Sequence, residues 1–365
     1  MVEFIRRLVE MESPSDDKPS VDRLGEFLAD SLGPVAAVRM HPARNFGNHL
    51  RIEFHLPGRK KAGQILALGH HDTVYPLGTL ARMPFRAAGG KLWGPGVFDM
   101  KTGIAIAVFA AEALRELDRP VARRLVLQLN SDEEVGSPSS RSITEREAKR
   151  SAAVLVLEPS AGLQGAVKTA RKGVGSYTLS VKGRAAHAGL DFESGASAVL
   201  ELSRQLVRIA GFTNLGRGLT VNPGIIAGGT RVNVVAEEAR AEIDFRIARL
   251  GDAARLEKRF RRLRPIDSRT TLAIDGGLNR PPLERTPAVA RLYRHARHLA
   301  AELGVELPET QVGGGSDGNF TAALGVPTLD GLGAVGEGAH SPGECVLGDR
   351  LAGRVALLAR LVESL

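Results

Sequence analysis

Short apolar runs alternate with amphipathic helical segments from Met1 to about Gly165, and this alternation restricts the possible folds more than any other feature of the sequence. The apolar spacing of residues 102–117 predicts a long helix in the middle of this region. The runs are bounded by Gly, Pro and Asn and lie at residues 50–54, 65–68, 125–129 and 154–157. Strands that are apolar on both faces and alternate with helices are typical of a mostly parallel sheet covered on both sides. We therefore expect an α/β fold here.

The hydrophobic period changes after about Lys168. Polar residues from Ser176 to Lys182 interleave with Tyr177, Leu179 and Val181, which indicates a strand with one solvated face. Similar spacing predicts helices at 196–209 and 252–263, and strands near 219–226, 231–247 and 269–274. A loop marked by Gly276, Gly277, Pro281 and Pro282 ends this region.

The α/β pattern then returns, with predicted helices at 287–303 and 349–365 and a strand near 326–329. At the N-terminus, Phe4, Ile5 and Leu8 predict an opening helix, and residues 21–32 a second helix with Ser20 as its N-cap. We infer a discontinuous α/β domain of residues 1–168 and 280–365, with an α+β domain of residues 169–279 inserted into it.

Composition removes several classes of protein. A single cysteine, Cys345, excludes an internal disulfide and a thiolate cluster, so any metal must be bound by His and carboxylate. No apolar run approaches the ~20 residues of a membrane-spanning helix, so no membrane contact and a cytoplasmic location are expected. The net charge is +8, but the aromatic content is only 4%. The most basic stretch, 255–264, has helical spacing, so we predict a solvated helix face and no nucleic-acid partner.

Potential metal ligands follow the ends of the predicted strands. Open α/β sheets bind ligands beyond the carboxyl ends of their strands, so these side chains should meet at one edge. The candidates stand in the segments Gly69–Val74, Gly94–Asp99, Asn130–Glu134, Glu158–Pro159 and Gly338–Ser341. Several acidic groups at one edge repel one another unless a cation lies among them. Imidazole and carboxylate without thiolate suit a catalytic zinc or a related divalent ion.

Two spacings fit a hydrolytic site. His70 and Asp72 are two residues apart, so in an extended segment both side chains project to one side, and Asp72 could orient a ligating His70. Glu133 and Glu134 are adjacent and should point apart, so that one binds metal while the other faces the water beside it. A carboxylate beside a metal-activated water is a general base.

These segments resemble the dinuclear zinc exopeptidases and deacylases, the family of glutamate carboxypeptidase, aminoacylase, acetylornithine deacetylase and succinyl-diaminopimelate desuccinylase. The motif sequences are most similar to those of the glutamate carboxypeptidase branch, and the resemblance spans nearly the whole chain. The motifs that carry it occur in the family's order: GHHDTV, GPGVFDMKTG, NSDEEVGS, LEPS, GRAAHAG, GGGSDG and GAHSPGE.

The resemblance implies a role for each position. His70 and Glu158 would bind one zinc, Glu134 and His340 the second, and Asp99 would bridge the two. Glu133 would be the catalytic base, and Asp72 would steer His70. The cofactor would be two Zn²⁺, with Co²⁺ or Mn²⁺ as possible substitutes. The family also suggests a cis peptide after the bridging aspartate, here Asp99–Met100.

The inserted domain would act as a lid and dimerisation domain in a homodimer. His187 resembles the histidine that reaches across a dimer to stabilise the oxyanion, and the sequence leaves open which subunit it serves. Asn233 and Arg246 match positions that hold the substrate carboxylate; for Arg246 an ion pair with Asp244 or Glu242 is an equal alternative. Gly314 and its neighbours would let backbone N–H groups approach the substrate.

Two rival functions remain open. Ser316 lies in a G-x-S-x-G sequence that Asp330 and His340 follow in triad order, but residues 308–312 offer little strand before it and a triad leaves the carboxylates unexplained. A non-catalytic peptide or amino-acid binder is the other rival, although the complete ligand set argues against it. We predict a zinc hydrolase that cleaves an amide or peptide bond next to a free carboxylate in a small molecule or short peptide, or alternatively an N-acyl-amino-acid deacylase that removes acetyl or succinyl groups.

Overall fold

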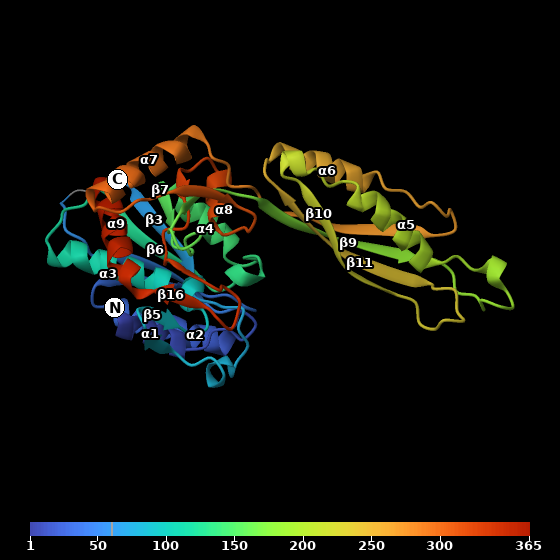
Figure 1. Ribbon diagram of the computed structural model, residues 1–365, viewed down its shortest axis with the longest axis horizontal. Coiled ribbons are helices and arrows are strands. Elements are labelled where there is room, and N and C mark those ends of the chain that lie inside the picture. Colours follow the sequence, from blue (N-terminus) through green and yellow to red (C-terminus); the bar gives the residue numbers. More distant parts are fainter. Residues whose placement is uncertain (60) are drawn as a thin grey trace. The chain divides into compact units, whose positions relative to one another are not determined.

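The computed structural model describes residues 1–59 and 61–365, which form two compact units (Figure 1). Unit 1 consists of Met1–Ala170, Leu283–Val312 and Ser316–Leu365. Unit 2 consists of Arg171–Pro282 together with Gly313–Gly315. Among the described residues, no helix combines the length and the apolar character needed to cross a bilayer.

Unit 1 is built on a six-stranded sheet in the order β1-β2-β6-β3-β7-β14. Neighbouring pairs among β6, β3, β7 and β14 are parallel, whereas β2 is antiparallel to both β1 and β6. Every residue of β3 is buried, as expected for a strand covered on both faces. The strands are β1 (Ala36–His41), β2 (His49–Phe54), β3 (Gln64–His70), β6 (Arg124–Asn130), β7 (Ser151–Val156) and β14 (Thr328–Leu329). The predicted α/β class with a mostly parallel mixed sheet is confirmed.

Helices cover both faces of this sheet. They are α1 (Val2–Glu10), α2 (Lys18–Leu32), α3 (Thr102–Glu116), α4 (Arg141–Lys149), α7 (Pro287–Glu302), α8 (Gly318–Ala323) and α9 (Leu351–Ser364). Residues of α1, α2, α3, α7 and α9 share one apolar core with the sheet, and α4 packs on the opposite face. The predicted cap of α2 was wrong: Asp17 is the N-cap, and its carboxylate accepts the N–H of Ser20. Strand β1 of the main sheet and helices α4 and α8 were not predicted.

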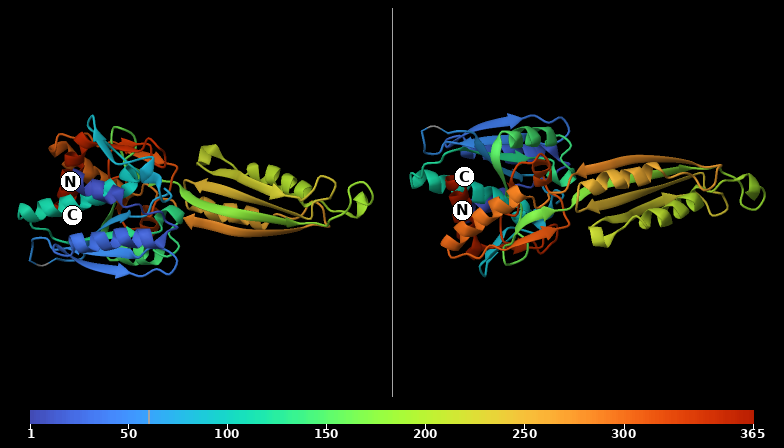
Figure 2. Two further views of the ribbon diagram at one scale, coloured as in Figure 1. Left: turned by 90° about the horizontal axis from the view of Figure 1, so that it is seen from below. Right: turned by 90° about the horizontal axis from the view of Figure 1, so that it is seen from above.

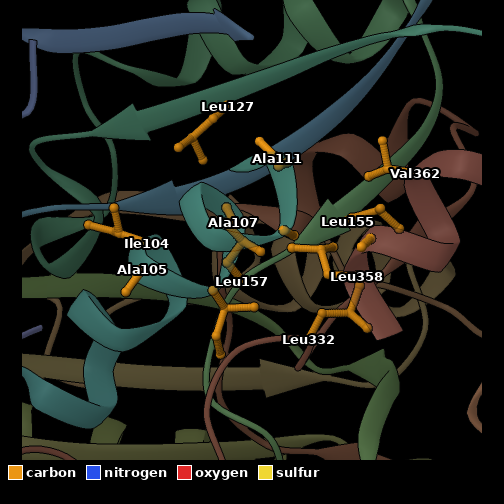
Figure 3. Close-up of a cluster of buried hydrophobic side chains, with 14 of the residues drawn as sticks. Ile104, Ala105, Ala107, Ala111, Leu127, Leu155, Leu157, Leu332, Leu358 and Val362 are labelled. Atoms are coloured by element: carbon orange, nitrogen blue, oxygen red, sulfur yellow. The ribbon is translucent and has the colours of Figure 1, made fainter. Parts of the chain in front are cut away.

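The core of unit 1 is centred on α3, whose Ile104, Ala107 and Ala111 lie among leucines of the neighbouring strands and of α9 (Figure 3). Two glycines bring α3 close to the sheet. A Cβ on Gly103 would lie 2.2 Å from the carbonyl oxygen of Leu157, and one on Gly69 would lie 2.5 Å from Cε of Met100. Only glycine fits at these two contacts without movement of the backbone or of Met100.

Two smaller sheets complete unit 1. One has the order β15-β16-β5-β4, with antiparallel neighbours, and the other pairs β13 with β8. Their strands are β4 (Arg86–Ala88), β5 (Lys91–Trp93), β8 (Val167–Arg171), β13 (Glu309–Val312), β15 (Gly336–Glu337) and β16 (Cys345–Leu347). The first of these sheets carries the loop between β15 and β16, which contains His340.

Unit 2 is a four-stranded antiparallel sheet in the order β10-β11-β9-β12, with α5 and α6 on one face (Figure 2). The elements are β9 (Gly173–Lys182), α5 (Ala198–Ala210), β10 (Thr220–Gly228), β11 (Glu238–Ile247), α6 (Gly251–Arg261) and β12 (Thr271–Arg280). Burial alternates along β9 and β11, which fits the predicted period of two.

Two boundaries in unit 2 differ from prediction. Residues 231–237 precede β11 instead of belonging to it. Gly276 and Gly277 lie inside β12, not in a loop, and both have positive φ, +119° and +154°. A Cβ on Gly276 would lie 2.2 Å from the carbonyl oxygen of Ser176 on β9, so these glycines permit close pairing of strands.

Candidate metal centre

The carboxyl ends of three neighbouring parallel strands deliver the central side chains of the site. β3 ends with His70, β6 is followed by a single 3-10 turn, Glu133–Val135, and β7 is followed closely by Glu158. Since β6, β3 and β7 are parallel neighbours, their ends meet at one edge of the sheet. Asp99 precedes α3, and His340 comes from the loop between β15 and β16.

The structure brings together the five residues that were predicted as metal ligands. Nε2 of His70 lies 3.2 Å from Oδ1 of Asp99 and 3.6 Å from Oε1 of Glu158. Nε2 of His340 lies 3.4 Å from Oδ2 of Asp99 and 3.3 Å from Oε2 of Glu134. The two oxygens of Asp99 thus face the two histidines. The peptide bond Asp99–Met100 is cis.

Two groups of donor atoms are close enough to hold a cation. His70, Asp99 and Glu134 form one group and His70, Glu133 and Glu158 the other, with all atoms in each group within 4.8 Å of one another. Oε1 of Glu134 is buried and has no hydrogen-bond partner, so it is available as a ligand. Nitrogen and oxygen donors with no thiolate fit Zn²⁺ or another divalent ion, and two cations can be held if Asp99 is shared.

Protons partly balance the negative charge of this cluster. Hydrogen bonds to Asp99 and Glu134 raise the pKa of His340 to about 10. Burial opposes a charged His70, but Asp72 and Asp99 outweigh it and raise the pKa of that imidazole well above its ordinary value. Burial alone would raise the pKa of Asp99, but bonds from His340 and His70 hold it well below its usual range. In this protonated form the histidines supply the positive charge that the carboxylates require.

Asp72 occupies the position predicted for a steering carboxylate, and it does more than face His70. Its Oδ1 lies 3.3 Å from Nδ1 of His70 and accepts the backbone N–H of Glu133 at 3.3 Å. Its Oδ2 accepts the N–H of Glu134 at 3.2 Å and the hydroxyl of Ser15 at 2.7 Å. One buried side chain therefore fixes the loop that carries both adjacent glutamates.

Glu344 is a supporting residue that sequence reasoning missed. Its Oε1 accepts the backbone N–H groups of Phe98 at 2.7 Å and Asp99 at 2.9 Å. Its Oε2 accepts the hydroxyl of Tyr75, which also donates to the carbonyl of Ser341 at 3.1 Å. The carboxylate thus joins the Asp99 segment to the loop of His340. The one signal in the sequence is that Glu344 ends the GAHSPGE motif, whereas its complete burial is visible only in the structure.

Ser316 does not form a catalytic triad. It is fully buried, and its hydroxyl donates to Oδ2 of Asp330 at 2.6 Å. His340, the third proposed member, contacts Asp99 and Glu134 instead. β13 does precede the serine, against expectation, but a hydroxyl enclosed in this way cannot reach a substrate. The following Asp317 accepts hydrogen bonds from Asn130 and Ser137 and so anchors the GGGSDG loop to the site.

The remaining predicted residues belong to unit 2. His187 is exposed, and its Nδ1 accepts the N–H groups of Gly189 and Leu190. Asn233 is also exposed. It lies beside His187, since its backbone carbonyl accepts the N–H of Ala188. The carbonyl of Gly314 accepts a hydrogen bond from Arg171 at 3.2 Å.

Arg246 lies near the other end of β11 and is paired with Asp244, with 2.9 Å between Nη2 and Oδ2. This is the ion pair that the sequence allowed as an alternative to binding substrate. Unit 2 therefore does not bring Arg246 together with His187 and Asn233.

The fold and the cluster of histidines and carboxylates define a metallohydrolase. The chain belongs to the peptidase family M20/M25/M40, whose family model matches residues 66–364. The family resemblance inferred from the motifs is thereby confirmed.

Named relatives include both peptidases and deacylases. Carboxypeptidase G2 of Pseudomonas sp. (strain RS-16) is 28% identical over 100% of this chain and 89% of its own length. Succinyl-diaminopimelate desuccinylase of Dechloromonas aromatica is 28% identical over 81% of this chain and 82% of its own.

Solved structures share the fold over the whole chain. An aminopeptidase from Bacillus cereus superposes with a TM-score of 0.78 at 20% identity and covers 99% of this chain and 97% of its own. A Bacillus subtilis protein described as a dinuclear metal-binding peptidase gives 0.70 at 14% identity, covering 99% and 96%.

Replacement of Glu344 by glutamine should weaken metal binding. The amide nitrogen cannot accept the hydrogen bonds that one carboxylate oxygen now receives, so the Asp99 and His340 segments lose their common anchor. Loss of a residue that holds the ligand-bearing segments in place costs about 10- to 100-fold in metal affinity. A competitive titration with a chromophoric chelator measures the affinity for Zn²⁺. Glu337→Gln is the control, because its half-exposed carboxylate contacts Lys91 and the thiol of Cys345 and none of the proposed ligands. Equal affinities in the two variants would contradict the role of Glu344.

Uptake of Zn²⁺ should release protons. The pKa of His340 is raised to about 10, so this imidazole is protonated at neutral pH and must lose its proton to become a ligand. The apparent affinity should therefore rise with pH between about pH 6 and about pH 8. Isothermal titration calorimetry in two buffers of different ionisation enthalpy counts the protons. Equal heats in both buffers would show that no proton is displaced.

Proposed function

We propose that the protein is a dinuclear zinc hydrolase that cleaves an amide or peptide bond next to a free carboxylate, as a glutamate carboxypeptidase does. The observation that carries the proposal is the position of Asp99 between His70 and His340, with a carboxylate beside each imidazole. The 28% sequence identity to carboxypeptidase G2, which extends over the full chain, supports the carboxypeptidase reaction. The similarity to a desuccinylase favours the second candidate, removal of an acetyl or succinyl group from an amino acid.

The contacts of the two histidines support two ligand sets. His70 and Glu158 would hold one Zn²⁺, Glu134 and His340 the other, and Asp99 would contribute one oxygen to each. When bound, such cations polarise the carbonyl of the scissile bond and lower the pKa of water toward ~7. Co²⁺ and Mn²⁺ accept the same nitrogen and oxygen donors.

Glu133 is the proposed general base. Its carboxylate lies within 4.8 Å of the donor atoms of His70 and Glu158, and its backbone N–H is held by Asp72. From this position it would take a proton from the attacking water and pass it to the leaving amine. Asp72 would act by positioning, since it fixes the ring of His70 and the Glu133–Glu134 loop together.

Arg246 and Gly314 are proposed to bind the substrate carboxylate. A guanidinium binds a carboxylate through two parallel hydrogen bonds, and Asp244 occupies that fork in the absence of substrate. Substrate would therefore displace Asp244 from Arg246. The backbone of Gly314 is exposed to a ligand on the side that Arg171 does not occupy.

His187 and Asn233 are proposed to act in the partner subunit of a homodimer. β11 runs from Glu238, close to Asn233, toward Arg246, and eight residues of extended chain span about 26 Å. This separation supports a second copy as the source of the imidazole, because a small substrate held by Arg246 would not span it within one unit 2. His187 would then donate a hydrogen bond to the oxyanion of the tetrahedral intermediate.

Unit 2 also offers a surface for this dimer. β10 is an edge strand, and Ile225 and Ile226 on it are 59% and 58% exposed. Helix α5 packs beside β10 and presents Leu200 and Val207, which are 51% and 76% exposed. An open strand edge with adjacent apolar side chains can pair with its own copy about a two-fold axis.

Substitution of Glu133 by alanine should abolish turnover but keep the metal. Loss of a general base costs about 10²- to 10⁴-fold in kcat, whereas the proposed zinc ligands are untouched. Activity is measured on peptides with C-terminal glutamate and on N-acetyl and N-succinyl amino acids, with and without chelator, beside zinc content. Glu337→Ala is the surface control. Retained turnover in Glu133→Ala would refute the role of Glu133, and full activity after complete removal of metal would refute the zinc hydrolase.

A heterodimer of two inactive variants should regain activity. One subunit carries Glu133→Ala and the other His187→Ala, so one of the two sites combines an intact Glu133 with an intact His187 from its neighbour. Co-expression with two affinity tags isolates this species, whose activity should be about half that of the wild-type dimer. Activity no higher than that of the single variants would show that His187 serves its own subunit.

A further inference from the structure

A basic pocket lies in unit 1 on the side formed by β1, β2 and α4, apart from the candidate metal centre. Its volume is about 400 Å³. It is lined by four arginines, one histidine and a single carboxylate: Arg39, His41, Arg51, Arg146, Glu147 and Arg150. None of these residues takes part in the proposed hydrolase site, so the inference below is independent of that proposal.

The one carboxylate is already engaged. Oε2 of Glu147 accepts hydrogen bonds from Nε of Arg51 at 3.1 Å and from Nε2 of Gln64 at 3.1 Å. Its Oε1 lies 3.4 Å from Nη1 of Arg150. In the part of the chain that the structure describes, Arg39 and Arg146 form no ion pair and no side-chain hydrogen bond. Two guanidinium groups thus border the pocket without an anionic partner.

The arrangement places like charges together. Arg39 and Arg51 stand directly opposite each other in the antiparallel register of β1 and β2, where like charges destabilise the pairing. Arg146 and Arg150 are four residues apart at the end of α4, and so lie on one side of the helix. The helix dipole favours basic residues in that last turn, but it gives no reason for the pair on the strands. A bound anion would offset this repulsion.

His41 adds a directed polar atom. It follows Arg39 on the same face of β1, and its Nε2 is buried and has no hydrogen-bond partner. Burial, together with the charges of Arg39 and Arg146, lowers the pKa of His41, so its imidazole is neutral at pH 7 and can donate one hydrogen bond. An unsatisfied polar atom at a pocket of this charge is a second sign of a missing ligand.

We propose that this pocket binds a small phosphate-bearing anion. Guanidinium forks match phosphate oxygens in geometry and charge. A basic surface in general does not explain the cluster, because arginines of α6 have partners: Arg261 pairs with Glu257 at 2.6 Å, and Arg255 with Asp252 at 3.7 Å. A free anion fits better than a nucleic acid, since the groups surround one hollow whose lining contains no Phe, Tyr or Trp on which a base could stack.

The test compares two double variants of the zinc-loaded, full-length protein that lose the same charge. Arg39→Ala/Arg146→Ala removes the unpaired arginines, and Arg255→Ala/Arg261→Ala is the matched control on α6. Isothermal titration calorimetry with inorganic phosphate should show binding at least about tenfold weaker in the first variant and unchanged in the control. Without phosphate, the first variant should unfold at the same or a higher temperature than wild type, because like-charge repulsion is relieved, and this confirms that it folds.

Several results would overturn the proposal. The first is the absence of saturable phosphate binding to wild type, and the second is equal weakening of phosphate binding in both double variants. The third is phosphate binding that persists in Arg39→Ala/Arg146→Ala but is lost in Asp99→Asn, because this would assign the phosphate to the metal centre. A DNA duplex is titrated in parallel by fluorescence anisotropy. Duplex binding that depends on Arg39 and Arg146 and is tighter than phosphate binding would replace the small anion by a nucleic acid.

Discussion

Repulsion among carboxylates at one edge of the main sheet is the constraint on which the catalytic unit depends. Asp99, Glu133, Glu134 and Glu158 gather around His70. The three glutamates are held there because they follow parallel strands that end side by side, and Asp99 reaches the same edge from the turn before α3. Positive charge must be present among them, as a proton on imidazole or as a cation. The contacts meet this requirement, because each of the two imidazoles lies beside two carboxylates.

The segments that carry Asp99 and the adjacent glutamates are single helical turns, and buried carboxylates accept backbone N–H groups of both. Asp72 accepts two backbone N–H groups of the Glu133 turn, and Glu344 accepts those of Phe98 and Asp99. Asp132 does the same for Ser139 and Ser140. An acidic side chain can replace missing main-chain partners because its oxygens accept several hydrogen bonds at once. The acidic residues of the site thus divide into those that face the ligand and those that organise the backbone.

The sequence predicted the parts of the molecule that a local pattern encodes. Four apolar runs became β2, β3, β6 and β7, and the ligands at their ends came together because parallel strands align their carboxyl ends. The role of Glu344 could not be derived in this way, because it depends on a contact with residues almost 250 positions earlier in the chain. β1 and α4 were missed because both are short and bury few apolar side chains, Ala36 in β1 and Ala148 in α4.

Unit 2 shows the limit of single-residue reasoning more clearly. Gly276 and Gly277 are typical loop residues, yet they lie in β12 where the neighbouring strand approaches closely. For Arg246, the sequence allowed substrate or Asp244 as its partner, and the structure shows Asp244. His187 follows β9 and lies near the start of β11, whereas Arg246 lies near the end of β11. This separation is set by the pairing of β9 with β11, which no local sequence pattern reveals.

Met100 links the core to the site, and its contacts constrain which substitutions this part of the chain can accept during evolution. Its sulfur accepts the N–H of His70 at 3.3 Å, and its methyl group fills the space left free by both Gly69 and Gly103. A side chain gained at Gly69 would be accommodated only after residue 100 had become smaller or had moved, and one at Gly103 would in addition require the carbonyl of Leu157 to move. The three positions therefore form an epistatic group whose substitutions are non-additive, and the order in which they accumulate decides which intermediates still fold.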